Sequence, residues 1–236
     1  LILLQFKKNN LFLSHLDNRK LYRKEKSNFV YLKILKAKNL VSIFDKCVED
    51  YHKIDDINQE IINPFEENSF KGILYRKCWI DTVQWHYEDI IRDDKIKPEE
   101  ALVLKRKIDE SNQKRTNLVE AIDDYFINKF KKVILQKNAT INTESPAWAI
   151  DRLSILILKI YHMKEESSRI SATKEHRIKC SEKLLILNEQ KSDLCLAINQ
   201  LTKDISMGRK IMKVYRQMKM YNDEDLNPIL YKKDVD

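Results

Sequence analysis

Apolar residues recur at every third or fourth position over most of the chain after residue 39, the spacing that places them on one face of an α-helix. In the first such stretch they are Leu40, Ile43, Phe44, Cys47, Val48 and Tyr51. Two later helix starts carry proline in the first turn, Pro98 and Pro146, and Ser145 offers an N-cap hydroxyl. The pattern predicts five long helices, at about residues 39–51, 69–93, 98–136, 146–166 and 172–207.

The helix that follows Ser145 is apolar nearly all round from Leu153 to Ile160, which predicts a place at the centre of a bundle. Gly208 marks either the end of the last long helix or a bend before residues 211–221. That segment interleaves basic residues with tyrosines, a pattern typical of a solvated amphipathic helix. Strand patterns are scarce. The predicted fold class is all-α: a single bundle of five or six mostly long helices with no significant sheet.

The net charge of +8 is unevenly distributed along the chain. Residues 1–33 hold eight of the 44 basic and two of the 36 acidic residues, which leaves 36 basic against 34 acidic residues elsewhere. We expect residues 1–33 to be a doubtful or poorly ordered basic leader that includes translated upstream sequence. Residues 34–236 should then form a single helical-bundle domain with a short C-terminal tail. Nucleic acid is disfavoured as a partner, because the domain itself is nearly neutral.

Several classes of protein are excluded by what the sequence lacks. Its two glycines, Gly72 and Gly208, are too few for a glycine-rich phosphate loop or a dinucleotide fold. Its four cysteines lie at least fifteen residues apart, so no CxxC pair of a zinc ribbon or a thioredoxin-like site exists. No stretch approaches the ~20 apolar residues of a membrane span. We therefore expect a cytoplasmic protein.

Ionisable and aromatic residues crowd into two segments that should be buried helix, residues 79–93 and 142–166. His86 and Asp89, like His162 and Glu165, are three residues apart and share a helix face. Two such helices could hold one divalent metal ion, with His86, Asp89, His162 and Glu165 as the ligands. However, a histidine followed three residues later by a carboxylate is more often a histidine whose ring is held by that carboxylate than a metal ligand. The sequence therefore assigns no metal or other cofactor.

The third helix has an apolar face that is interrupted for two turns by Ser111, Asn112 and Arg115. Such an interruption indicates either a polar crevice or a buried hydrogen-bond network, and both interpretations stay open. Asp151 and Arg152 enter the central helix within its first two turns, so one of them should point inward. The preferred buried ion pair joins Asp151 to Arg115 or to Arg152.

Four stretches carry a resemblance to a known family: CWIDTVQWHYEDIIRD, ALVLKRKIDESNQKRTNLVEAID, NTESPAWAIDRLSILILKIYHM and KVYRQMKMYND. Together they resemble the bacterial family called domain of unknown function 4254, common in Bacteroidetes, over about residues 39–231. The resemblance implies a cytoplasmic, mostly helical bacterial protein, and the family has no established activity to carry over. It also implies an association with sugar-transferase genes of the cell envelope.

The leading hypothesis is a protein that binds a small anionic ligand, a phosphorylated or nucleotide-linked sugar, in a polar crevice of the bundle core. The predicted lining residues are Trp85, His86, Asp89, Asn112, Arg115, Asp151, Arg152 and His162. Arg115 and Arg152 would hold the anion, and His86 or His162 would transfer protons if there is catalysis. One alternative is a divalent-metal-dependent hydrolase. The other is a non-catalytic protein partner of an envelope-polysaccharide glycosyltransferase.

Overall fold

Helix α5 (Pro146–Ser168) contacts the four other long helices of the bundle, as its almost uniformly apolar sequence predicts. The computed structural model describes residues 36–218, 220 and 223–231. The leader predicted at residues 1–33 lies outside these described residues.

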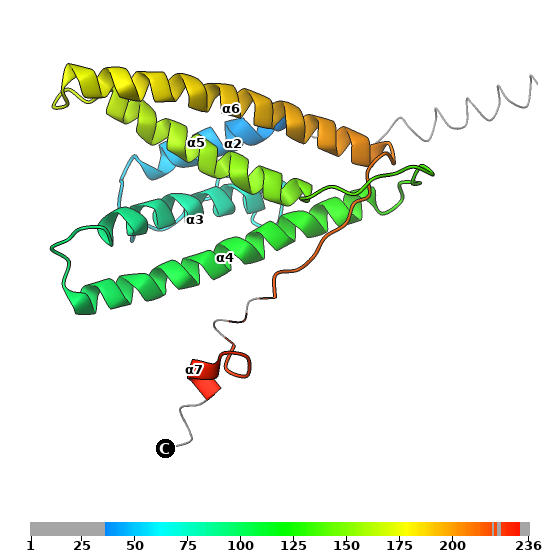
Figure 1. Ribbon diagram of the computed structural model, residues 1–236, viewed down its shortest axis with the longest axis horizontal. Helices are drawn as coiled ribbons and strands as arrows, with labels where there is room; N and C mark the ends of the chain where they lie inside the picture. Colours follow the sequence, from blue (N-terminus) through cyan, green and yellow to red (C-terminus); the bar gives the residue numbers. More distant parts are fainter. Residues whose placement is uncertain (1–35, 219, 221–222, 232–236) are drawn as a thin grey trace, which may run out of the picture.

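The other long helices are α2 (Ala37–Tyr51), α3 (Phe70–Ile90), α4 (Pro98–Phe130) and α6 (Lys174–Ser206), and a short α7 spans Pro228–Tyr231. Figure 1 shows two helical hairpins, α3 with α4 and α5 with α6, with α2 lying across both behind α5. In the described part of the chain there is no strand beyond one isolated bridge between Thr140 and Lys210. The predicted all-α bundle is confirmed.

Side-chain hydroxyls cap three of the helices at the positions where the sequence predicts their starts. Ser69 accepts a hydrogen bond from the backbone N–H of Gly72, Ser145 from that of Trp148, and Thr173 from that of His176. Helix α4 ends at Phe130, shorter than predicted. Helix α6 ends before Gly208, whose φ of +68° is a left-handed conformation that other residues rarely adopt.

The predicted helix over residues 211–221 is wrong, because the described residues 211–218 form an extended segment. Figure 1 shows this segment running from the end of α6 across α4. Its backbone is held at the start by the hydrogen bond from the Ile211 N–H to the Thr140 carbonyl, 2.9 Å long. Further along, Arg216 pairs with Asp124 and donates to the carbonyl of Glu120 at 3.1 Å. These contacts with distant residues replace the helical hydrogen bonds that the local pattern favours.

A buried ion network ties α3 to α5. The Lys77 ammonium is fully buried and lies 2.5 Å from the Asp81 carboxylate and 2.7 Å from that of Asp151. Ser154 of α5 donates a hydrogen bond of 2.6 Å to Asp81. Burial raises the pKa of Asp81, and the charge of Lys77 opposes that rise. A charge taken out of water costs several kcal/mol unless it is paired, so the three ions depend on one another.

A second polar contact fixes the end of α2 against α3. The Tyr75 hydroxyl donates to the Asp50 carboxylate at 2.9 Å, and Lys46 and Lys53 donate to it at 2.9 and 2.7 Å. Burial alone would raise the pKa of Asp50, but the three donors outweigh it and lower the pKa from 3.8 to about 2. This contact also holds in place the residues just after α2.

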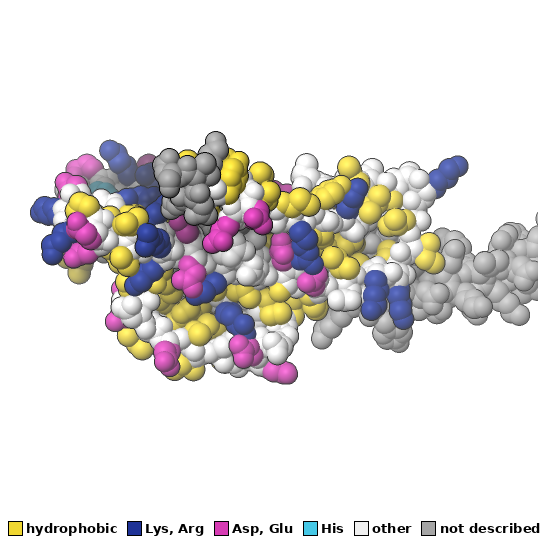
Figure 2. Space-filling model, turned by 90° about the horizontal axis from the view of Figure 1, so that it is seen from below, with side chains coloured by type: hydrophobic (Ala, Val, Ile, Leu, Met, Phe, Trp, Pro, Cys, Tyr) yellow, Lys and Arg dark blue, Asp and Glu magenta, His cyan; other side chains and the backbone are white. Residues whose placement is uncertain are grey.

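Two observations concern the described surface and the apolar character of its helices. Within residues 36–218 and the described tail, no helix combines the length and the apolar character needed to cross a bilayer. Figure 2, seen from below, shows basic and acidic side chains interspersed among apolar ones on that face. On the face shown, neither sign of charge therefore forms a continuous patch.

We expect Lys77→Met to destabilise the fold by about 3–5 kcal/mol at neutral pH, because two buried carboxylates lose their counter-ion. Urea unfolding followed by circular dichroism measures the change. The matched control is Lys105→Met, which removes an exposed lysine paired with Asp109 on α4 and should cost under about 0.5 kcal/mol. Equal effects of the two substitutions would contradict the buried network.

The Asp50 contact predicts a specific dependence of stability on pH. The pKa of Asp50 is lower in the folded protein than in the unfolded chain, so its carboxylate stabilises the fold above about pH 4. That contribution is lost as the pH falls towards 2. The difference in unfolding free energy between the wild type and Asp50→Asn should therefore shrink over this range. A difference that stays constant with pH would show that the carboxylate is not responsible.

Candidate metal centre and adjoining crevice

Three histidines from three helices meet at the end of α2. His52 caps the C-terminus of α2, His86 lies in the last turns of α3, and His162 lies on α5. One ring nitrogen of each lies within 4.8 Å of the others. The Nε2 atoms of His52 and His86 are 3.3 Å apart. All three side chains are largely buried, with exposed fractions of 7%, 20% and 19%.

Two of the rings are held by their Nδ1 atoms, so that Nε2 is left to face the cluster. His52 Nδ1 lies 2.7 Å from the Val48 carbonyl, and His162 Nδ1 lies 3.1 Å from the Glu165 carboxylate. Both acceptors require a proton on Nδ1, so in the neutral rings Nε2 carries the lone pair. His162 Nε2 is buried and has no hydrogen-bond partner among the described residues. Hydrogen bonds of this kind, from Nδ1 to a carboxylate or carbonyl, orient histidines that bind metals.

Aromatic side chains fix the planes of the three rings. Tyr161 stacks on His52 with the ring centres 4.2 Å apart, and Tyr51 stacks on His86 at 5.2 Å. Trp85 stacks on His162 at 4.9 Å. Because each imidazole rests on a neighbouring ring, the directions of the Nε2 atoms are set before any ligand arrives.

The surroundings of His86 and His162 favour the uncharged form of these two imidazoles. Burial lowers the pKa of His86 and of His162, and the proximity of His52 lowers both further. The carboxylate of Asp55 lies 3.6 Å from His86 Nε2 and 4.0 Å from His52 Nε2, and it opposes the effect at His86. The neutral ring is the form that coordinates a metal ion.

One pair of ring nitrogens has the separation expected for two ligands of a transition metal ion. Zinc binds imidazole nitrogen at about 2.0–2.1 Å, so nitrogens on one tetrahedral ion lie roughly 3.3 Å apart. The Nε2 atoms of His52 and His86 already have that separation. Asp55, with 56% of its side chain exposed and a left-handed φ of 56°, places a carboxylate within 4.0 Å of both of these nitrogens.

A crevice of about 360 Å³ adjoins the cluster between α3, α4 and α5. Its lining includes Asp81, Gln84, Trp85, Glu88, Asp89, Arg92, Arg115, Ile155 and Leu158. The Arg115 guanidinium lies 3.8 Å from Asp151, and its Nε atom is buried without a hydrogen-bond partner among the described residues. Trp85 is shared, because its indole lines the crevice and stacks on His162.

The structure divides the predicted lining residues between these two places. Trp85, Asp89 and Arg115 line the crevice, whereas His86 and His162 belong to the histidine cluster. At the wall of the crevice the side-chain amide of Gln84 donates a hydrogen bond of 2.9 Å to Asn112. The Ser111 hydroxyl donates to the carbonyl oxygen of the same Gln84 amide. The interruption in α4 is thus both a hydrogen-bond network and the edge of a crevice.

Of the two neighbours at the start of α5, Asp151 is the one that points inward, and Arg152 neither pairs with it nor lines the crevice. Arg152 is 60% exposed and pairs with Glu144 just before α5. The solvent-facing positions of α5 include residues 152 and 159, so Arg152 turns outward while Asp151 turns inward. Asp151 lies behind the crevice, and its close partner is Lys77 at 2.7 Å, with Arg115 at 3.8 Å.

Sequence reasoning missed His52, Asp55 and Lys77. A polar residue just after a helix is ordinary, so nothing local distinguishes His52 or Asp55. Lys77 carried a usable signal, because Asp81 follows it by four residues on a helix face that also holds Leu74 and Cys78. Glu165, predicted as a metal ligand, instead contacts the Nδ1 of His162 on the side away from the cluster.

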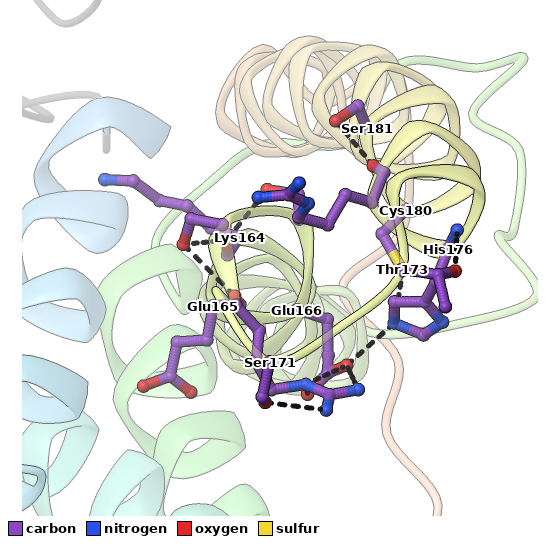
Figure 3. Close-up of polar contacts among 12 residues, drawn as sticks. Lys164, Glu165, Glu166, Ser171, Thr173, His176, Cys180 and Ser181 are labelled. Atoms are coloured by element: carbon purple, nitrogen blue, oxygen red, sulfur yellow. Dashed lines mark hydrogen bonds and ion pairs between the residues drawn. The ribbon is translucent and has the colours of Figure 1, made fainter.

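A second group of ionisable residues, shown in Figure 3, lies at the turn between α5 and α6. His176 Nε2 lies 2.8 Å from Glu166 and 3.3 Å from the thiol of Cys180. A catalytic triad needs the nucleophile and the acid on opposite ring nitrogens, whereas here both meet the same nitrogen. Together with the Arg169–Glu166 ion pair, the group holds the turn in place.

A search of curated proteins and a search of solved structures both find no match to the chain. The family model described as protein of unknown function, DUF4254, matches residues 71–214, more than half of the 236 residues. The match covers α3, α4, α5 and α6 and includes His86, His162 and the whole crevice lining, whereas His52 lies before it. The chain belongs to the DUF4254 family.

Proposed function

We propose that the protein binds one divalent transition metal ion through His52, His86 and His162 and uses it in a hydrolytic reaction. The observation that carries the proposal is the convergence of three ring nitrogens within 4.8 Å. Support comes from the Nδ1 hydrogen bonds of His52 and His162, which direct both Nε2 atoms inward. Three imidazoles form a ligand set that suits zinc, copper, iron or nickel better than magnesium or calcium.

Hydrolysis is favoured because three protein ligands leave a coordination position for water. This is the arrangement of catalytic zinc sites, in which the ion lowers the pKa of the bound water to about 7. Held by His52, His86 and His162, the ion would supply a water ready to attack an electrophilic centre as the bond to the leaving group breaks. A nearby base would take one proton from that water, and the leaving group would gain a proton. Asp55 and Asp89 are two exposed carboxylates near the histidines and are the candidates for that base.

The proposal keeps two of the four ligands predicted from the sequence and changes the roles of the others. His86 and His162 remain ligands, and His52 joins them. Glu165 orients His162 from behind. Asp89 lies beside the rings, where its charge raises the pKa of His86 and of His162 against the effect of burial.

We expect protein purified without an affinity tag and stripped with a chelator to bind one equivalent of Co²⁺, seen as visible absorption bands of a tetrahedral ion. His52→Ala, His86→Ala and His162→Ala should each weaken binding by more than the roughly 10- to 100-fold attributed to outer-shell partners. The matched control is His176→Ala, which removes a histidine of the α5–α6 turn and should leave the affinity unchanged. Titration calorimetry measures the dissociation constant of Co²⁺ for each protein. Absence of binding, or equal loss in the control, would sink the proposal.

Substitution of Glu165 separates its two possible roles. As a partner of His162 Nδ1, Glu165→Gln should lower the affinity for Co²⁺ by roughly 10- to 100-fold while one ion still binds. X-ray absorption at the cobalt edge should report the same number of nitrogen ligands in the wild type and the variant. Loss of an oxygen ligand from the spectrum would instead show that Glu165 coordinates the ion directly.

A further inference from the structure

We infer that the crevice between α3, α4 and α5 binds the anionic group of a small molecule, with Arg115 as its anchor, and that this molecule is the substrate of the adjoining metal centre. The second clause rests on the proposed function, whereas anion binding by the crevice does not. The argument uses the charges left unpaired in the crevice, its shape and the residues that it shares with the histidine cluster.

Arg115 is the cation of the crevice with the weakest internal partner. Its closest carboxylate, on Asp151, is 3.8 Å away and lies only 2.7 Å from the buried Lys77 ammonium. By contrast, Arg92 at the same crevice is paired with Glu88 at 2.6 Å. A guanidinium presents five donors in a planar fork that fits a phosphate or a carboxylate bidentately. Arg115 lines the crevice with 24% of its side chain exposed, so an anion in the crevice can contact this side chain, although its Nε atom is buried.

The remaining lining suits a molecule with an apolar or flat body. Trp85, Ile155 and Leu158 supply apolar surface, and the Gln84 amide and the Asp89 carboxylate supply polar groups. A volume of about 360 Å³ falls within the range of roughly 300–1,000 Å³ for sites that bind small molecules. It is too small for a folded partner or a nucleic-acid strand. The chemistry therefore favours a small organic phosphate or carboxylate.

Two residues join the crevice to the histidine cluster. Trp85 forms part of the crevice wall, and the same indole stacks on His162 with the ring centres 4.9 Å apart. Asp89 lines the crevice, and its charge acts on both His86 and His162. A molecule anchored at Arg115 and lying along Trp85 consequently extends towards the metal centre. Asp89 is placed to accept a proton between the two.

The test uses phenylphosphonate, which pairs a flat apolar ring with an anionic head and resists hydrolysis. Titration calorimetry is performed on the full chain, first free of metal and then loaded with Co²⁺. Binding to the metal-free wild type is expected, and Arg115→Met should weaken it at least about tenfold. The matched control is Arg152→Met, which removes the exposed arginine next to Asp151 and should leave binding unchanged.

Arg115→Met also removes a partner of Asp151, so the variant could lose binding because it misfolds. A second variant therefore tests the crevice without changing Arg115. Ile155→Trp narrows the crevice without altering any charge, and it should abolish phenylphosphonate binding while the circular dichroism spectrum stays that of the wild type. Retained binding in a folded Ile155→Trp protein would overturn the assignment of the crevice.

The outcomes separate this inference from the proposed function. If phenylphosphonate binds only the Co²⁺ form and Arg115→Met has no effect, it binds the metal ion alone. That result would refute anion binding by the crevice and leave the proposed metal centre intact. Binding that needs Arg115 in a protein that takes up no metal supports the crevice and refutes the metal centre. Failure of both forms to bind overturns the inference. A change in the Co²⁺ absorption bands on binding, lost in Arg115→Met, would establish that the two places share one substrate.

Discussion

A buried ammonium ion between two carboxylates determines how α3 meets α5, and the geometry of the candidate site follows from that contact. Lys77 of α3 reaches Asp151 of α5 at 2.7 Å, in an interior where an unpaired charge is costly. Further along the same two helices, and in the same chain direction, Trp85 of α3 stacks on His162 of α5. The helices therefore run parallel, with the ion pair at one level and the contact between Trp85 and His162 at another.

Local sequence signals sufficed for most of the fold, because helix periodicity and capping are local properties. The hydroxyls of Ser69 and Ser145 cap helices where their sequence context predicts, and α5 lies at the centre for the reason its composition indicates. Local signals failed for residues 211–218, where basic and aromatic residues mimic an amphipathic helix. There the conformation depends on Thr140 and Asp124, and sequence spacing carries no information about partners so far away.

The candidate site shows the same division between local and distant information. Arg115 stands out because it interrupts an otherwise apolar helix face, and Trp85, His86 and His162 stand out because they lie in the two segments where ionisable and aromatic residues crowd. Their distribution over two adjoining places could not be predicted, since it depends on the rotation of α3 between α2 and α4. His52 carries no such signal, because it follows the last turn of α2, where polar residues are common. Arg152 misled because the sequence did not show which narrow side of α5 faces solvent: adjacent residues point about 100° apart, and in the structure Asp151 is buried whereas Arg152 is exposed.

The three histidines come from positions 52, 86 and 162, so an ion bound by all three would cross-link segments that are far apart in the sequence. It would fasten the end of the first described helix to two helices that follow much later in the sequence. A ligand that binds only the folded state at 100 times its dissociation constant adds about 2.7 kcal/mol of stability. That is a large fraction of the 5–15 kcal/mol by which proteins are typically stable. The lifetime of the folded protein would then track the supply of the ion, and metal starvation would lower its abundance as well as its activity.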